Sequence, residues 1–404
     1  MLDPSFADRL DTELAGDDAW RERRYPGTPH HRQPVHTAYV PADQFGAGTA
    51  AGWGVAALAA LDEHGPLPGF GPGIQQLVRA KLADEPVEDL RIDFEDGYGT
   101  RADTDEDTHA RAAAQALAQA AAAGTAPPFQ GLRMKSLEGP TRRRALRTVD
   151  LFLATVLDAG PLPDGFRITL PKVTSVAQVT AMTGLCEALE EHYGLPPLRF
   201  EIQVETPQAV LGPDGTALIA PMLHAAAGHC LGLHFGTYDY TAALGIAPGS
   251  QAMDHPAADH AKAVMQIAAA GTGAVVSDGS TNVLPVGSHA EVLAGWELHA
   301  GLVRRSLERG FYQGWDLHPA QLASRFAATF GWFREGFPDA AQRLSQYLAG
   351  TPSRVLDEPA TARALAGWLT RALACGAITD TDLAQAGLTR AMLAVRGHGT
   401  AGHG

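Results

Sequence analysis

The stretch Phe200–Val210, FEIQVETPQAV, has the pattern of a buried strand that stops abruptly. Phe200, Ile202 and Val204 alternate with polar residues, which is typical of a β-strand. Pro207 cannot donate to a sheet ladder, so Glu205 is expected at the carboxyl end of the strand. An acid at this point is explained either as a simple strand-ending residue or as part of the active-site rim of a barrel enzyme.

Similar short β-rich runs alternate with Ala- and Leu-rich helical stretches along the chain. The expected strands are HTAYV (36–40), LRIDF (90–94), GLRMK (131–135), FRITLP (166–171), RFEIQVE (199–205), CLGLHFG (230–236), GAVVSD (273–278) and GFYQGWDL (310–317). The expected helices cover 106–123, 141–158, 175–192, 256–270 and 288–309, and the segment between the first two strands should hold two more.

Eight strands that alternate with helices indicate parallel strands joined by right-handed crossovers. Eight is also the number that closes a (β/α)8 TIM barrel, so an α/β barrel is the predicted fold class. A doubly wound open sheet is the alternative, but no GxGxxG follows the first expected strand.

The barrel is predicted to form the catalytic domain, residues 35–330. An N-terminal segment (1–34) precedes it and contains the polar, Pro-rich loop RYPGTPHHRQP. A helical extension (331–395) follows it. The tail (396–404) carries two histidines among glycines, and a disordered tail is favoured there over a metal site.

Composition and charge indicate which partners and which cellular compartment to expect. The chain has 404 residues and a formal net charge of −14, which argues against nucleic acid or an anionic membrane as the main partner. The three cysteines are far apart and form no CxxC pair, so a reduced, cytoplasmic protein is expected. Neither a signal peptide nor an apolar run of membrane-spanning length is expected.

The active site of a TIM barrel lies at the carboxyl ends of its strands, where this chain places many charged residues. In chain order they are Asp93, Glu95, Asp96, Arg133, Lys135, Lys172, Glu205, Asp239, Asp278, Asp316 and His318. Any one of them is more readily explained as a cap or a solvated loop residue. Together they predict a rim on which carboxylates and cations converge.

Glu205 and Asp239 follow neighbouring strands and suit a hard divalent cation. Mg²⁺ takes one or two protein carboxylates and leaves its other positions to water and substrate, and Mn²⁺ is the alternative ion. Arg133 could grip a carboxylate or an enolate oxygen bidentately. A metal and an arginine around a 2-oxo acid would stabilise the enolate that forms when a carbon–carbon bond breaks.

Six motifs in order, spread through residues 35–325, resemble a known family of TIM barrels. They are YVPA (39–42), IDFEDGYG (92–99), LRMK (132–135), LPKVTS (170–175), QVETPQAV (203–210) and FGTYDYTAALGI (235–246). The family is the HpcH/HpaI aldolase and citrate lyase beta subunit-like family, which includes malyl-CoA lyase and belongs to the phosphoenolpyruvate/pyruvate-binding barrels.

The resemblance implies a Mg²⁺-dependent carbon–carbon lyase, either an aldolase or an enzyme like citrate or malyl-CoA lyase. Its substrate would be a 2-oxo or 2-hydroxy acid or the CoA ester, cleaved through a metal-stabilised enolate in a homo-oligomer. Glu205 and Asp239 become the metal ligands, and Arg133 faces the substrate oxyanion. Glu95 or Asp96 would orient metal-bound water or the arginine. The expected substrate-binding residues are Arg133, Lys135, Lys172, Tyr238 and His318.

The chain also departs from the family pattern. Thr174 stands where a carboxylate is common, Asp96 where the aldolase branch has a base histidine, and Ala42 where a glycine is usual. The departures leave the branch open and motivate an alternative, a non-catalytic barrel that binds a small organic acid or a partner protein. The only basic stretch for CoA phosphates is GPTRRRALR (139–147), and a solvated helix face is the favoured interpretation of it.

Several single residues allow two interpretations. Lys172 could form a Schiff base, but an ion pair with the nearby carboxylates is favoured. His318 is equally well explained as an acid or base and as a residue that holds the last loop. Packing is favoured over substrate contact for Tyr238. Glu201 precedes Glu205 on the same strand face and is expected deeper in the barrel, away from the metal.

Overall fold

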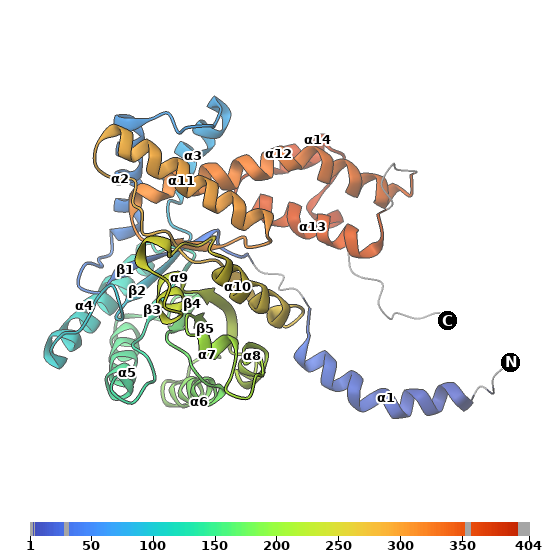
Figure 1. Cartoon of the computed structure of the whole chain (residues 1–404), viewed down its shortest axis with the longest axis horizontal. Helices are drawn as coiled ribbons and strands as arrows, with labels where there is room; N and C mark the ends of the chain where they lie inside the picture. The colour runs from blue at the N-terminus through green and yellow to red at the C-terminus, as the bar shows by residue number, and fades with distance from the viewer. Residues whose placement is uncertain (1–2, 4, 28–31, 352–356, 395–404) are drawn as a thin grey trace. The chain divides into compact units, whose positions relative to one another are not determined.

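The computed structural model describes residue 3 and residues 5–27, 32–351 and 357–394, and it confirms the predicted fold class (Figure 1). Eight strands form a nearly closed barrel with surrounding helices, in the sheet order β7-β6-β5-β4-β3-β2-β1-β8. The predicted disorder of the tail (396–404) lies outside the described residues.

Each strand overlaps one of the predicted runs. The strands are β1 His36–Pro41, β2 Asp89–Asp93, β3 Phe129–Arg133, β4 Phe166–Leu170, β5 Arg199–Val204, β6 Cys230–Phe235, β7 Val275–Ser277 and β8 Gly314–Asp316. The pairs β1–β8, β3–β4, β4–β5, β5–β6 and β6–β7 run parallel. Strands β2 and β4 are buried along their whole length, as expected of a parallel sheet covered on both faces.

The predicted helices are confirmed, including the pair between the first two strands. The α-helices are α1 Ser5–Arg24, α2 Thr49–His64, α3 Pro72–Asp84, α4 Asp103–Ala122, α5 Arg142–Ala159, α6 Val176–Tyr193, α7 Pro207–Val210, α8 Ile219–Ala225, α9 Thr237–Ala243, α10 Pro256–Ala269, α11 His289–Glu308, α12 Leu322–Ala349, α13 Pro359–Ala374, α14 Asp380–Gln385 and α15 Arg390–Leu393. Two 3₁₀ helices are η1 Pro248–Ser250 and η2 Pro319–Gln321.

Helix α1 lies within the N-terminal segment and is not predicted by the sequence pattern. None of its residues is buried. A helix that buries no face needs no periodic apolar stripe, so the main sequence signal for a helix is missing there.

The chain divides into two compact units. The first comprises residues 1–31, 39–47 and 90–280, and the second comprises residues 32–38, 48–89 and 281–404. The predicted boundary at 330/331 falls inside α12, which runs without interruption through it. The predicted domain boundaries stay predictions.

In the first unit, helices α4 to α6 flank strands β3 to β5 (Figure 1). Helix α5 turns one apolar face inward, because Ala145, Val149, Phe152 and Val156 recur at helical spacing and are all buried. The Phe152 ring stacks on Phe166 of β4 with 6.1 Å between centroids. Full burial of one such side chain stabilises the fold by roughly 1.5–3 kcal/mol.

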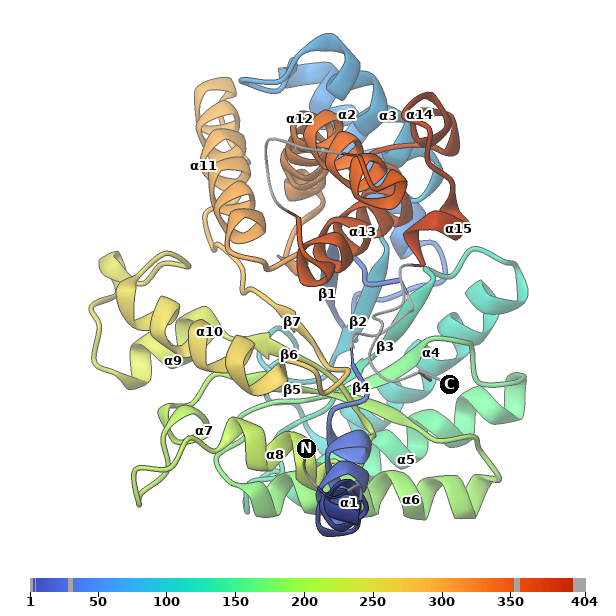
Figure 2. The same cartoon turned by 90° about the vertical axis from the view of Figure 1, so that its right-hand side faces the viewer.

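In the second unit, α12 packs against α3, α11 and α13 (Figure 2). Asp316 at the end of β8 accepts hydrogen bonds from Arg325 Nε and Nη2, and its Oδ2 lies 2.9 Å from His36 Nδ1. These partners are all buried, so Asp316 is held inside the unit by a compensated charge network.

None of the helices in the described ranges is both long and apolar enough to span a bilayer.

Candidate active site

The loop after β2 is folded around Asp93. Its two carboxylate oxygens accept the backbone N–H groups of Glu95 at 2.9 Å and of Gly97 at 2.8 Å. A Cβ at Gly97 would lie 2.6 Å from Asp93 Oδ2, so only glycine lets the turn close this tightly. The sequence IDFEDG therefore becomes a compact turn that presents Glu95 and Asp96 beyond the strand.

The same Asp93 carboxylate holds Arg133 of β3. Arg133 Nε and Nη2 donate to its two oxygens at 2.7 and 2.6 Å, while Nη1 lies 3.3 Å from Glu95 Oε2. The guanidinium also lies over the Tyr39 ring, 4.9 Å from its centroid. This bidentate grip fixes the plane of the arginine and directs Nη1 toward Glu95. Sequence reasoning missed Asp93 and Tyr39 as partners of Arg133, although both stand in the quoted motifs.

Glu205 follows β5 and is fully buried. Its Oε1 accepts the backbone N–H of Lys172 at 2.7 Å. A Cβ at Gly236 would lie 2.4 Å from Glu205 Cβ, so the glycine makes room for this side chain. Pro207 ends the strand as predicted and is also the first residue of α7, whose N-cap is Thr206.

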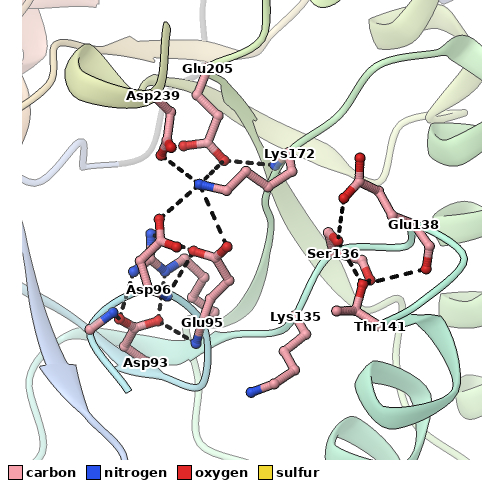
Figure 3. Close-up of polar contacts among 12 residues, drawn as sticks. Asp93, Glu95, Asp96, Lys135, Ser136, Glu138, Thr141, Lys172, Glu205 and Asp239 are labelled. Carbon is pink, nitrogen blue, oxygen red and sulfur yellow. Dashed lines mark hydrogen bonds and ion pairs between the residues drawn. The ribbon is translucent and has the colours of Figure 1, made fainter. Parts of the chain in front are cut away.

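Four carboxylates converge on the ammonium group of Lys172 (Figure 3). Lys172 Nζ lies 2.5 Å from Asp239 and 2.8 Å from Asp96. It lies 3.6 Å from Glu95 and 3.8 Å from Glu205. Ion pairing, the favoured interpretation of Lys172, is therefore what the structure contains. Predicted residues that follow four strands, β2, β4, β5 and β6, come together at one point.

The cluster is short of positive charge. Burial raises the pKa of Glu95 to about 8, with Asp96 and Glu205 adding repulsion. Burial likewise raises the pKa of Glu205 to about 7, although Lys172 opposes the shift. Burial also acts to raise the pKa of Asp96, but the hydrogen bond and charge of Lys172 prevail and lower it. Carboxyl groups that hold protons near neutral pH indicate a site in which negative charge is incompletely balanced.

Glu201 lies in a different environment, as predicted. Arg91 Nη2 donates to it at 2.7 Å, Arg167 Nη1 at 3.1 Å and Thr169 Oγ1 at 3.2 Å. Although burial disfavours its charge, Arg91, His234 and Arg167 hold the pKa of Glu201 well below its usual value. His234 is fully buried with Nε2 3.4 Å from Glu201, so it is a residue of the barrel interior.

Two predicted substrate-binding residues are engaged in other contacts. Lys135 donates to the Phe94 carbonyl at 2.6 Å, pairs with Glu106 at 2.9 Å, and points away from the carboxylate cluster in Figure 3. His318 caps η2 by accepting the Ala320 N–H at 3.2 Å, and burial lowers its pKa. This geometry favours the interpretation in which His318 holds the last loop.

Tyr238 lies in α9 beside Asp239 and is half-buried.

Two of the four arginines in the basic segment 139–147 are paired with carboxylates. Arg144 lies 2.6 Å from Asp107 and 3.4 Å from Glu106, and Arg147 also pairs with Asp107. The favoured interpretation as a solvated helix face therefore agrees with the structure, since two of the arginines already have carboxylate partners.

The donor set suits a magnesium ion in its chemistry, because carboxylate oxygens are the ligands that Mg²⁺ prefers. Among the described residues, however, no group of three or more His, Cys, Asp or Glu side chains is arranged to hold a metal. The carboxylates are arranged around an ammonium group instead. Glu205 and Asp239 could hold a metal only if Lys172 Nζ left its position 2.5 Å from Asp239.

Residues 14–400 match the family model described as a domain of unknown function, DUF6986. The chain belongs to this family. No curated protein matches it.

Solved structures share the barrel of this DUF6986 protein. The native malate synthase of Haloferax volcanii has a TM-score of 0.53 and 14% identity, over 79% of this chain and 86% of the other. Its magnesium/glyoxylate complex has a TM-score of 0.50 and 14% identity, over 85% and 99%. The citrate lyase beta subunit of M. tuberculosis with oxaloacetate and magnesium is 18% identical, over 73% and 96%, with a TM-score of 0.44.

At these identities the likeness shows the fold. The likeness to the malate synthase agrees with the barrel fold of this chain. Membership of the HpcH/HpaI aldolase family stays a prediction.

Proposed function

We propose that this barrel is a Mg²⁺-dependent carbon–carbon lyase that acts on a 2-oxo or 2-hydroxy acid or on the CoA ester of such an acid. The observation that carries the proposal is the convergence of Glu95, Asp96, Glu205 and Asp239 beyond the carboxyl ends of their strands. Such a rim is where barrel enzymes carry out their chemistry.

Glu205 and Asp239 would hold the metal. When bound, Mg²⁺ supplies a Lewis acid that polarises the carbonyl oxygen of the substrate. The malate synthase that shares this fold forms a complex with magnesium and glyoxylate, which is a 2-oxo acid. The raised pKa of Glu205, about 7, supports a cation at this point, since an added positive charge would relieve the repulsion that buried carboxylates share.

Glu95 is suited to move a proton. A general acid or base works best when its pKa lies near the working pH, and the pKa of Glu95 is raised to about 8. Its Oε2 lies 3.3 Å from Arg133, a distance at which the arginine stabilises the carboxylate once the proton has left. Arg133 is itself fixed by Asp93 and supplies positive charge beside the reacting carbon atoms.

A second candidate function follows from the position of Lys172. If its ammonium stays among the carboxylates, the barrel binds a small organic acid or a partner protein without metal-dependent turnover. The short contacts of Lys172 to Asp96 and Asp239 favour this alternative.

The proposed chemistry can be tested without knowing the second product, because an enolate-forming enzyme exchanges the proton next to a carbonyl group. Pyruvate, oxaloacetate and 2-oxobutyrate would each be incubated in D₂O with the protein and Mg²⁺, and deuterium uptake at C3 followed by ¹H NMR. We expect Mg²⁺-dependent exchange with at least one acid. Exchange should fall by roughly 10²-fold or more in Glu95→Gln, since general base catalysis contributes on that order.

Arg147→Met is the control, because Arg147 is 60% exposed and pairs with Asp107, which is not part of the carboxylate cluster. It should exchange at the wild-type rate. Binding of these acids with no exchange in any of them would favour the second candidate function and contradict the first.

The remaining predictions concern the whole protein and stay predictions. A homo-oligomer would be detected by light scattering, use of CoA esters by a substrate panel, and a cytoplasmic location by fractionation. Mn²⁺ as an alternative ion can be compared with Mg²⁺ in the exchange assay.

A further inference from the structure

Lys172 contacts the carboxylate cluster through both its backbone and its side chain. Its N–H donates to Glu205 Oε1 at 2.7 Å, and its Nζ lies within 4 Å of all four carboxylates. Figure 3 shows the side chain extended into the centre of the group. The ammonium therefore occupies the place in the rim that a divalent cation would need.

This position is built into the backbone. Lys172 has a φ of 53°, and Ala227 is the other non-glycine residue with positive φ among those described. A left-handed backbone conformation is unfavourable for a residue with a Cβ. The next residue is held as well, because Thr206 Oγ1 donates to the Val173 carbonyl at 2.5 Å. The fold thus accepts local strain at the point that aims Lys172 at Glu205.

A magnesium ion and this ammonium exclude each other. Mg²⁺ binds carboxylate oxygens at about 2.1 Å. Lys172 Nζ lies 2.5 Å from the Asp239 oxygen, so a metal on Asp239 and Glu205 would meet the ammonium at very short range. Two positive charges cannot share that space, and the flexible member of the pair is the lysine side chain, which is 21% exposed.

Positive charge is still needed at the rim once a metal has taken the place of the Lys172 ammonium. Asp93, Glu95, Asp96, Glu205 and Asp239 face two cationic side chains, Arg133 and Lys172. An anionic substrate adds further negative charge. Arg133 is already gripped by Asp93, which leaves Lys172 as the cation in this cluster that can turn toward the substrate.

We propose that Lys172 is an exchangeable counter-ion: its ammonium holds the carboxylates until a divalent cation displaces it, and it then binds the carboxylate of the substrate. The inference rests on the proposed function. It makes Lys172 the residue that couples metal binding to acid binding, so that the metal binds first and the acid second.

The test is one variant with two opposite effects. In Lys172→Met, isothermal titration should show roughly tenfold tighter Mg²⁺ binding, because the competing cation is gone. Pyruvate should bind the Mg²⁺-loaded variant roughly tenfold more weakly, because the counter-charge of its carboxylate is gone. Each tenfold change corresponds to about 1.4 kcal/mol. A merely structural lysine would weaken both affinities together. Arg147→Met, which removes a charge from an exposed ion pair with Asp107, should change neither.

A measurement on the wild-type chain covers the case in which Lys172→Met does not fold. Acetylation of lysines by acetic anhydride, followed by mass spectrometry, should be faster at Lys172 when Mg²⁺ is present and unchanged at Lys135. An unchanged or slower rate at Lys172 would overturn the exchange.

The outcomes separate this inference from the proposed function. Tighter Mg²⁺ and weaker pyruvate binding in Lys172→Met support both. Mg²⁺ binding in the wild type that the substitution leaves unchanged or weakens overturns the exchange and leaves the metal-dependent function standing. Absence of Mg²⁺ binding in the wild type, together with binding in Lys172→Met, keeps Lys172 as the occupant and overturns the metal-dependent function.

Discussion

Glu201 and Glu205 belong to the same segment and the same face of the barrel, and both are buried, yet they have opposite electrostatics. Glu201 contacts two arginines and has a pKa well below its usual value. Glu205 contacts the backbone and the distant ammonium of Lys172, and its pKa is raised to about 7. Burial disfavours the charge of both, so the number of close cations decides the difference.

The comparison teaches how to separate a structural acid from a functional one in this barrel. The charge of Glu201 is balanced by Arg91 and Arg167 of the chain itself, so no ligand is needed to balance it. Glu205 is placed among other carboxylates that the chain balances only in part. A site with incomplete internal compensation is one that a ligand can complete.

Glu201→Gln should have the largest effect on stability. The substitution leaves Arg91 and Arg167 buried without a full counter-charge, and breaking a buried ion pair costs roughly 3–5 kcal/mol. Urea denaturation would measure the change. Glu205→Gln is the matched control and should cost much less. Equal losses in the two variants would contradict the contrast between the two glutamates.

The pH dependence of stability comes next in size. On folding, the pKa rises from 4.5 to about 7 for Glu205 and to about 8 for Glu95. The folded chain therefore binds more protons than the unfolded chain from about pH 4.5 to about pH 8. The contribution of the two glutamates to stability is therefore complete below about pH 4.5 and is lost as the pH rises to about 8. Thermal unfolding at pH 5 to 9 in the presence of EDTA would show this decline.

Glu205→Gln should flatten that decline, because a neutral amide no longer titrates. Glu201→Gln should not flatten it, since the pKa of Glu201 lies far below this range. A wild-type protein that gains stability across the same window would mean that the cluster is fully compensated.

Arg147→Ala should have the smallest effect. Arg147 is 60% exposed and pairs with Asp107 on the outer surface. Exposed ion pairs contribute little to stability, so the free energy of unfolding should change only slightly. The substitution also removes a charge from the only predicted basic segment for CoA. If CoA esters bind there, their affinity would fall while that of the free acid stays unchanged.

The sequence was sufficient for the barrel because strand and helix periodicities repeat along it. Buried strands such as IQV in β5 and amphipathic helices such as α5 carry those signals in their own residues. Helix α1 escaped prediction because it buries nothing. The position of strand ends then brought Glu95, Asp96, Glu205 and Asp239 together, since parallel strands share one carboxyl edge.

The partners within the site could not be predicted in the same way. That Lys172 turns inward depends on its left-handed backbone and on the Glu205 contact, which no local pattern encodes. Lys135, with an equally suggestive position, turns instead to Glu106 of α4. Side-chain direction at a strand end is decided by tertiary contacts, so the sequence proposes candidates and the structure chooses between them.

The most direct test of the proposed metal site is a calorimetric titration with Mg²⁺ at pH 8. It compares the wild-type chain with Glu205→Gln and Glu201→Gln. One Mg²⁺ per chain is expected in the wild type and in folded Glu201→Gln, and none in Glu205→Gln. Absence of binding in the wild type, or equal binding in Glu205→Gln, would contradict the proposed metal site.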